Sequence, residues 1–118
     1  MKLWLPVLLA AFVIAAVPAP EAPAWKAGAA SAKITPEKPM WMAGYAGRTK
    51  PSEGVELDLF AKALVLTDQA GGRFVLITLD LIGVPRNLHL AVAERVKKEH
   101  GIEPANLAIN ASHTHSGP

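Results

Sequence analysis

Two histidines, His113 and His115, stand one residue apart in the segment SHTHSGP, residues 112–118. Side chains of an extended segment alternate between two faces, so residues two apart point the same way and can share one small volume. Neutral imidazole is the commonest metal ligand. A catalytic zinc ion usually takes three protein ligands and keeps an open position, so a further ligand must come from elsewhere. The pair indicates part of a metal site, and two ordinary polar loop histidines are the alternative.

Asp80 interrupts the apolar run FVLITLDLIG, residues 74–83. A carboxylate among apolar residues is costly unless it is paired or coordinates a metal ion. One interpretation is a metal ligand, or an acceptor for the second ring nitrogen of a ligating histidine. The other is a strand-end residue that accepts a hydrogen bond from a nearby backbone N–H. Both readings stay open from the sequence.

Other candidate residues favour a structural interpretation. His89 and His100 fall on or near the polar side of a predicted helix, where solvated side chains are expected. Ser116 has no paired base and lacks the strand–serine–helix elbow of serine hydrolases, so a nucleophilic role is disfavoured. The apolar residues 40–42, Met-Trp-Met, favour packing of a loop over lining of an apolar substrate site.

The first half of the chain predicts strands and one long loop. Residues 27–36 are typical of a short strand that Pro36 ends, and residues 37–54 form a loop rich in Gly and Pro. Two further strand-like runs, 59–68 and 73–83, are separated by the turn residues 69–72. Such a short turn containing glycine predicts a β-hairpin.

The second half predicts a helix followed by a strand. Pro85 suits a first helical turn, Leu88, Val92 and Val96 recur on one face, and Gly101 suits the C-terminal cap. A strand over 106–112 follows. A strand–helix–strand unit joins parallel strands by a right-handed crossover in nearly all cases. We therefore predict an α/β fold with a mixed sheet.

This topology has a consequence for the candidate site. Parallel strands end at the same edge of the sheet, and open α/β sheets bind ligands beyond the carboxyl ends of their strands. Asp80 follows the first strand of the unit, and His113 and His115 follow the second. We therefore expect a carboxylate and two imidazoles on one rim.

Composition and the N-terminal segment indicate an exported protein without disulfides. The chain has 118 residues, no cysteine and a net charge of +2, which does not indicate nucleic acid as a partner. A basic start, an apolar run and an Ala22-Pro23-Ala24 site predict a cleaved export signal over residues 1–24. A retained N-terminal anchor is the alternative. A lipid-anchored export route needs a cysteine and is excluded, as are disulfides. The expected location is secreted or periplasmic, with residues 25–118 forming the folded part.

Several segments together resemble one enzyme family. NLAINA followed by SHTHSGP looks like the histidine motif of the neutral/alkaline non-lysosomal ceramidases, near the start of their catalytic domain. In the same order as in that family, AGAASAKITP resembles the opening strand, WMAGYAGR the Gly-Tyr loop, LFAKALVL the next strand and VLITLDLIGV the strand with the aspartate. The resemblance covers about residues 26–118, and the motifs are specific as a set.

The resemblance implies a zinc-dependent hydrolysis of the amide bond of ceramide, or a related lipid amide, to sphingosine and a fatty acid. By this resemblance His113 is a zinc ligand and His115 a catalytic residue that faces the substrate amide. Gly44 and Tyr45 contact the substrate, and Asp80 lies close to the zinc site. The partner is a lipid-like small molecule, which allows peripheral contact with a membrane surface.

Two points limit what the chain does alone. The family's other zinc ligands lie far downstream, so the resemblance implies the N-terminal part of a longer enzyme, inactive by itself. Ala46 stands where active members often carry serine after Gly-Tyr, so the identity of the lipid amide substrate stays open.

Two alternative functions remain. One is a metal hydrolase with an amidohydrolase-type (β/α)₈ barrel, which also begins its metal site with a strand ending in His-x-His. The other is a secreted binding module without enzymatic activity.

Overall fold

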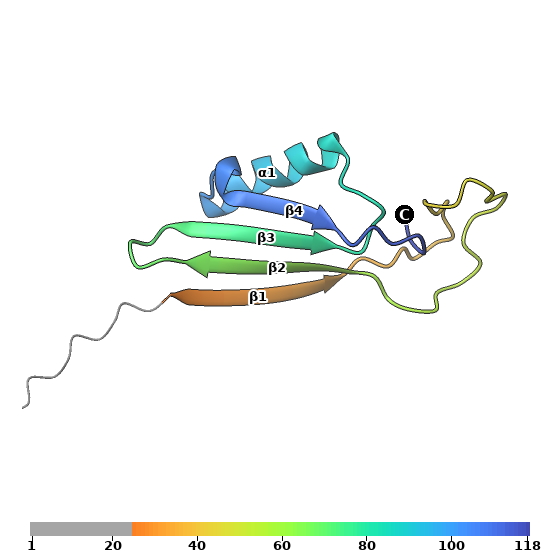
Figure 1. The fold of residues 1–118 in the computed structure, drawn as a ribbon, viewed down its shortest axis with the longest axis horizontal. Helices are drawn as coiled ribbons and strands as arrows, with labels where there is room; N and C mark the ends of the chain where they lie inside the picture. The colour runs from red at the N-terminus through yellow and green to blue at the C-terminus, as the bar shows by residue number, and fades with distance from the viewer. Residues whose placement is uncertain (1–24) are drawn as a thin grey trace, which may run out of the picture.

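A computed structural model describes residues 25–118, so the predicted export signal, residues 1–24, lies outside the described residues. Six elements follow one another along this part of the chain (Figure 1). They are β1 (Lys26–Lys33), β2 (Phe60–Thr67), β3 (Arg73–Leu79), helix α1 (Arg86–His100), the 3₁₀ turn η1 (Pro104–Asn106) and β4 (Leu107–Ala111). Within residues 25–118, no helix has the length and apolar character needed to cross a bilayer.

The described strands form one mixed sheet in the order β1-β2-β3-β4. β1 pairs antiparallel with β2, and β2 pairs antiparallel with β3. The last pair, β3 with β4, is parallel, and α1 lies between these two strands in the chain. The mixed sheet and single helix expected from the sequence are therefore confirmed, while the right hand of the crossover stays a prediction.

The β2–β3 connection is the predicted hairpin, and side-chain hydrogen bonds fix its turn. Asp68 accepts hydrogen bonds from the backbone N–H groups of Ala70 and Gly72 at 2.9 and 2.7 Å. Gly71 has φ of +85°, a conformation that favours glycine. An aspartate followed by a left-handed glycine is a common turn chemistry, which explains why the sequence predicts it correctly.

Helix α1 covers part of one face of the sheet and closes the core. The helix starts after Pro85 and ends at Gly101, whose φ of +64° and N–H bond to the Lys97 carbonyl at 2.9 Å form a left-handed cap. Four buried residues form the core cluster: Val75, Ala93, Ile102 and Leu107. Burying a valine, isoleucine or leucine side chain, as at Val75, Ile102 and Leu107, stabilises the fold by about 1.5–3 kcal/mol. The core thus ties α1 to β3 and β4, the two strands that lead to the candidate site.

The carboxyl ends of β3 and β4 lie next to each other. Leu79 and Ala111, the last residues of the two strands, are direct partners in the parallel register. Asp80 and Ser112 are therefore the first residues beyond the sheet on neighbouring strands. Figure 1 shows that the loop between β1 and β2 and the C-terminal end of the chain lie at this same end of the sheet.

Candidate active site

The histidine segment lies against the chain that leaves β3. The N–H of Ser112 donates to the Leu79 carbonyl at 2.9 Å, and the N–H of Thr114 donates to the Leu81 carbonyl at 3.3 Å. Ile82 returns a bond from its N–H to the Pro118 carbonyl at 3.0 Å. These backbone hydrogen bonds continue the pairing of the β3 and β4 chains beyond the end of the sheet. They therefore fix the backbone position of residues 112–118, which include both histidines.

The backbone and ring of His113 are both constrained. His113 has φ of +57°, the left-handed conformation that few residues other than glycine adopt. Its ring Nδ1 lies 2.8 Å from the carbonyl oxygen of Ile82. A carbonyl can only accept, so in the neutral ring Nδ1 carries the proton and Nε2 keeps its lone pair. This is the arrangement by which a ligating histidine is usually oriented, because its second nitrogen donates to a carbonyl or carboxylate.

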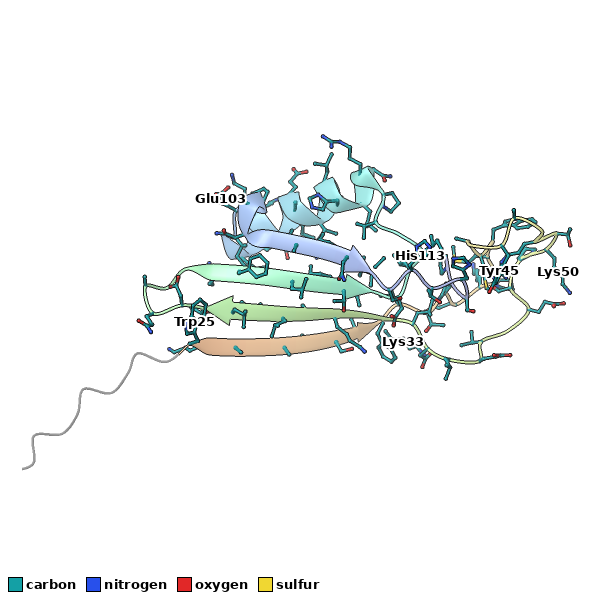
Figure 2. The ribbon with its side chains drawn as sticks, viewed as in Figure 1. Trp25, Lys33, Tyr45, Lys50, Glu103 and His113 are labelled. Atoms are coloured by element: carbon teal, nitrogen blue, oxygen red, sulfur yellow. The ribbon has the colours of Figure 1, made fainter. Side chains whose placement is uncertain are left out.

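His115 lies against the Gly-Tyr loop. A Cβ atom added at Gly44 would stand 2.5 Å from Cγ of His115, so only glycine leaves room for the ring. The ring of Tyr45 meets that of His115 edge-on, with centroids 5.1 Å apart and planes at 77°. The centroids of the His113 and His115 rings are also 5.1 Å apart. Figure 2 shows Tyr45 and His113 at the same end of the molecule. The two imidazoles therefore share one region with Gly44 and Tyr45.

Arg48 also belongs to this group, although the sequence motifs did not indicate it. Its guanidinium donates to the backbone carbonyl of His115 and stands 5.3 Å from the ring centroid of Tyr45. Arg48 follows Gly47 in the same loop. A backbone hydrogen bond from the N–H of Ala43 to the Gly117 carbonyl, at 2.9 Å, also holds this loop against the histidine segment. The signal available was a cation directly after the uncharged run of residues 39–47.

The Asp80 carboxylate forms a hydrogen bond within the sheet. Its Oδ2 accepts a hydrogen bond from the N–H of Phe60 at 2.9 Å, and its own N–H donates to the Phe60 carbonyl at 3.0 Å. These bonds secure the start of β2 against the end of β3, as in the strand-end interpretation left open by the sequence. Asp80 lies on the expected rim, and its closeness to a metal ion stays a prediction.

A cavity of about 980 Å³ lies against the histidine segment, but neither His113 nor His115 lines it. Asp80 lines it together with Ser112, Thr114 and Ser116, which alternate with the two histidines along the chain. Met40 and Met42 add apolar surface from the loop. The cavity therefore combines hydroxyl and carboxylate groups with apolar side chains.

One titrating group on this cavity is perturbed. The hydrogen bond from the Thr35 hydroxyl to Asp58, at 2.8 Å, lowers the pKa of the Asp58 carboxyl below its usual value of 3.8. The Lys33 ammonium, 3.3 Å from the same carboxylate, lowers that pKa further. Figure 2 places Lys33 at the end of β1. These contacts join the chain that leaves β1 to the chain that enters β2.

Within residues 25–118, no group of three or more His, Asp or Glu side chains is arranged to hold a metal ion. His113 nevertheless fits the role of a single ligand, because its Nε2 is free and its Nδ1 is fixed by a carbonyl. The described residues can thus contribute to a metal site but do not complete one.

Comparison with known proteins gives one consistent result. Residues 25–118 match the family described as neutral/alkaline non-lysosomal ceramidase, N-terminal. Neutral ceramidase 2 of Arabidopsis thaliana is 33% identical over 76 residues, which are 63% of this chain and 10% of that protein. Neutral ceramidase of Pseudomonas aeruginosa is 32% identical over 77 residues, 63% of this chain and 12% of that protein.

Solved structures agree with these sequence matches. The crystal structure of neutral ceramidase from Pseudomonas aeruginosa matches with a TM-score of 0.72 and 34% identity, over 80% of this chain and 16% of that one. A ceramidase complexed with C2 matches with the same TM-score and identity, over 80% of this chain and 15% of that one. The chain thus spans about a tenth to a sixth of the proteins that it matches.

Proposed function

Because the chain belongs to the neutral/alkaline non-lysosomal ceramidase family, as its N-terminal part, we propose that the full-length protein is an exported zinc-dependent amidohydrolase. Its substrate is ceramide or a related lipid amide, and its products are sphingosine, or the corresponding amine, and a fatty acid. The relatives named above are ceramidases, which supports this reaction class.

The orientation of His113 is the observation that carries the metal assignment. The Ile82 carbonyl, 2.8 Å from Nδ1, selects the tautomer in which Nε2 can bind a cation. A zinc ion, when bound, would lower the pKa of a water molecule and polarise the amide carbonyl. Zinc usually takes three protein ligands in catalytic sites. We infer that the other ligands come from parts of the longer protein that this chain does not include.

The other site residues then have separate tasks. His115, whose ring centroid lies 5.1 Å from that of His113, donates a hydrogen bond to the oxygen that gains charge, or moves a proton to the leaving amine. Gly44 and Tyr45 contact the polar end of the substrate. Asp80 holds the ends of β2 and β3 in place beside the site, through its bond to the N–H of Phe60.

The substrate assignment stays at the class of lipid amides. This class is supported by the family match and not by a cavity, because the cavity lined by Ser112, Thr114 and Ser116 does not include His113 or His115. Ala46 lacks a hydroxyl group next to Tyr45. We therefore propose ceramide first and other N-acyl amides second.

The test uses the full-length protein with two matched histidine variants. We expect His113→Ala to lose bound zinc and amide hydrolysis while the protein stays folded. His100→Ala, at the exposed end of α1 with its side chain 62% accessible, is the control and should keep both. Zinc is measured by mass spectrometry and turnover by release of fatty acid from N-acylsphingosine. Full zinc content and turnover in His113→Ala would overturn the assignment.

Two alternatives are separated by the fold and by a second variant. A (β/α)₈ barrel consists of parallel strands. The antiparallel pairing of β1, β2 and β3 argues against that fold. A binding module without activity predicts unchanged behaviour in His115→Ala, whereas the proposed enzyme predicts lost turnover with bound zinc retained. We further expect residues 25–118 alone neither to bind zinc tightly nor to hydrolyse substrate, because the described residues do not complete a metal site.

Export is the remaining part of the proposal. The basic start, apolar run and small-residue site within residues 1–24 support cleavage before Trp25. N-terminal sequencing of protein recovered outside the cytoplasm should begin near that residue. A mature protein that still starts at Met1 would indicate the retained anchor instead.

A further inference from the structure

We propose that Arg48 is a positioning residue for His115, holding its backbone and its ring neighbour Tyr45 at the same time. This inference rests on the proposed function for its catalytic consequence. Its structural part concerns only contacts within residues 25–118 and can be tested separately.

The first contact is with the histidine segment itself. The guanidinium Nη2 of Arg48 donates to the backbone carbonyl of His115, across 67 residues of sequence. A hydrogen bond from a charged donor is stronger than one between neutral groups. The contact lies at the residue proposed to act on the substrate, so a shift of this carbonyl also shifts the ring attached to the same residue.

The second contact reaches the same histidine through its neighbour. The Arg48 guanidinium stands 5.3 Å from the centroid of the Tyr45 ring, within the range of a cation–π interaction. The Tyr45 ring in turn meets the His115 ring edge-on. Gly44 closes a further side, because its lack of a Cβ lets the His115 ring approach the backbone. Arg48 therefore positions His115 in two ways: directly through the backbone carbonyl, and indirectly through the Tyr45 ring that contacts the imidazole.

The inward position of the Arg48 side chain costs free energy, and its contacts with His115 and Tyr45 must offset that cost. Its Nε atom is buried and has no hydrogen-bond partner within the described residues. A buried donor without a partner is unfavourable. A long, solvated cation in a loop would ordinarily avoid this position, so the contacts with His115 and Tyr45 explain why the side chain turns inward.

The arrangement leaves the reactive atoms of His115 free. Arg48 binds the carbonyl of His115, and the structure shows no hydrogen bond to either ring nitrogen of His115 from the residues that it describes. A residue that fixes the ring without occupying its nitrogens suits a group that must exchange a proton or bind an oxygen atom. Arginine fits this task better than lysine, because its planar guanidinium can donate and stack simultaneously.

The experiment compares Arg48→Met, Arg48→Gln and Arg48→Lys with Arg95→Met in the full-length zinc-loaded protein. Arg95 is the matched control: its side chain is 77% accessible on α1 and pairs with Glu99 at 2.9 Å. We expect kcat on N-acylsphingosine to fall about 10- to 100-fold in Arg48→Met, because a small misplacement of a catalytic group has effects of that size. Zinc content should stay unchanged, since Arg48 does not contact His113, and KM should change less than about threefold.

The second measurement is NMR spectroscopy of the His115 ring nitrogens. Long-range ¹H–¹⁵N spectra report the ring nitrogens of each histidine, and His115→Ala identifies the signals of that ring. We expect these signals to shift in Arg48→Met and Arg48→Gln but not in Arg95→Met. Arg48→Lys, which keeps a donor for the carbonyl but does not stack in the same way, should recover part of kcat relative to Arg48→Met.

The outcomes separate the inference from the proposed function. Unchanged His115 ring signals in Arg48→Gln would overturn the positioning role. Where His115→Ala loses turnover, a kcat of Arg48→Gln within about twofold of the unsubstituted protein would overturn it as well. Arg48→Gln keeps this test decisive if Arg48→Met fails to fold. If His115→Ala retains full turnover, the catalytic role proposed for His115 is wrong, while the ring signals still decide whether Arg48 holds that ring.

Discussion

Replacing Gly44 with alanine is the sharpest test of how the Gly-Tyr loop supports His115. Gly44 has φ of +103°, and an added Cβ would lie 2.5 Å from Cγ and 2.8 Å from Nδ1 of His115. Strain at a sparsely populated backbone conformation costs about 1–3 kcal/mol. Forcing a methyl group into occupied space costs about a further 1–3 kcal/mol. We therefore expect Gly44→Ala to lower stability by roughly 2–6 kcal/mol, or to displace the His115 ring to relieve the contact.

Two other glycines separate these two costs. Gly71 has φ of +85° but nothing within 4 Å of an added Cβ, so Gly71→Ala measures backbone strain alone. Gly47 lies in the same loop as Gly44 and also has nothing within 4 Å of an added Cβ, without a positive φ. We expect the loss of stability to be largest in Gly44→Ala, smaller in Gly71→Ala and smallest in Gly47→Ala.

The assay is the urea midpoint of the full-length protein at fixed zinc concentration, measured together with kcat for each variant. Gly44→Ala should be the variant of the three that also changes kcat, because it is the one whose added methyl group meets a site residue. A Gly44→Ala protein as stable as Gly71→Ala, with unchanged kcat, would refute the close approach of His115 to the loop.

Three further predictions follow from single contacts. His113→Asn should lose zinc but stay folded, because asparagine tolerates the left-handed backbone, whereas His113→Val should lose stability as well; zinc analysis and thermal unfolding separate the two. Asp80→Asn keeps an acceptor for the N–H of Phe60, so it should be more stable than Asp80→Ala by about 1–3 kcal/mol, measured by urea unfolding. The lowered pKa of Asp58 means that the unfolded chain binds the proton more readily, so this group's contribution is present above about pH 4 and is lost as the pH falls through its folded pKa. Asp58→Asn should therefore weaken the acid dependence of stability below about pH 4, and an unchanged acid transition would contradict this.

Much of the fold could be predicted because its signals are local. The turn at Asp68 and Gly71, the glycine cap at Gly101 and the apolar face of α1 each depend on residues close in sequence. The parallel pairing of β3 with β4 then follows from the length of the connection between them. This pairing is what brings Asp80 and the histidine segment to the same rim.

The partners within the site could not be predicted, because they depend on register and on irregular loops. The bond between Asp80 and Phe60 exists because β2 starts directly opposite the end of β3, a detail that strand patterns do not specify. The contact of Arg48 with His115 joins residues 67 positions apart through a loop with no periodicity. The left-handed backbone of His113 is likewise set by the chain leaving β3, since its ring bonds to the Ile82 carbonyl.

The two histidines are therefore fixed by different parts of the chain, and this difference has consequences for how the site can fail. His113 is oriented by Ile82, just beyond β3, and so depends on the packed unit of β3, α1 and β4. His115 is oriented by Gly44, Tyr45 and Arg48, and so depends on the loop that connects β1 to β2. Changes in the loop should then alter turnover at constant zinc content, whereas changes beyond β3 should alter zinc content first. A loop variant that released zinc without unfolding the protein would mean that the two imidazoles act as one unit, contrary to the separate contacts that hold them.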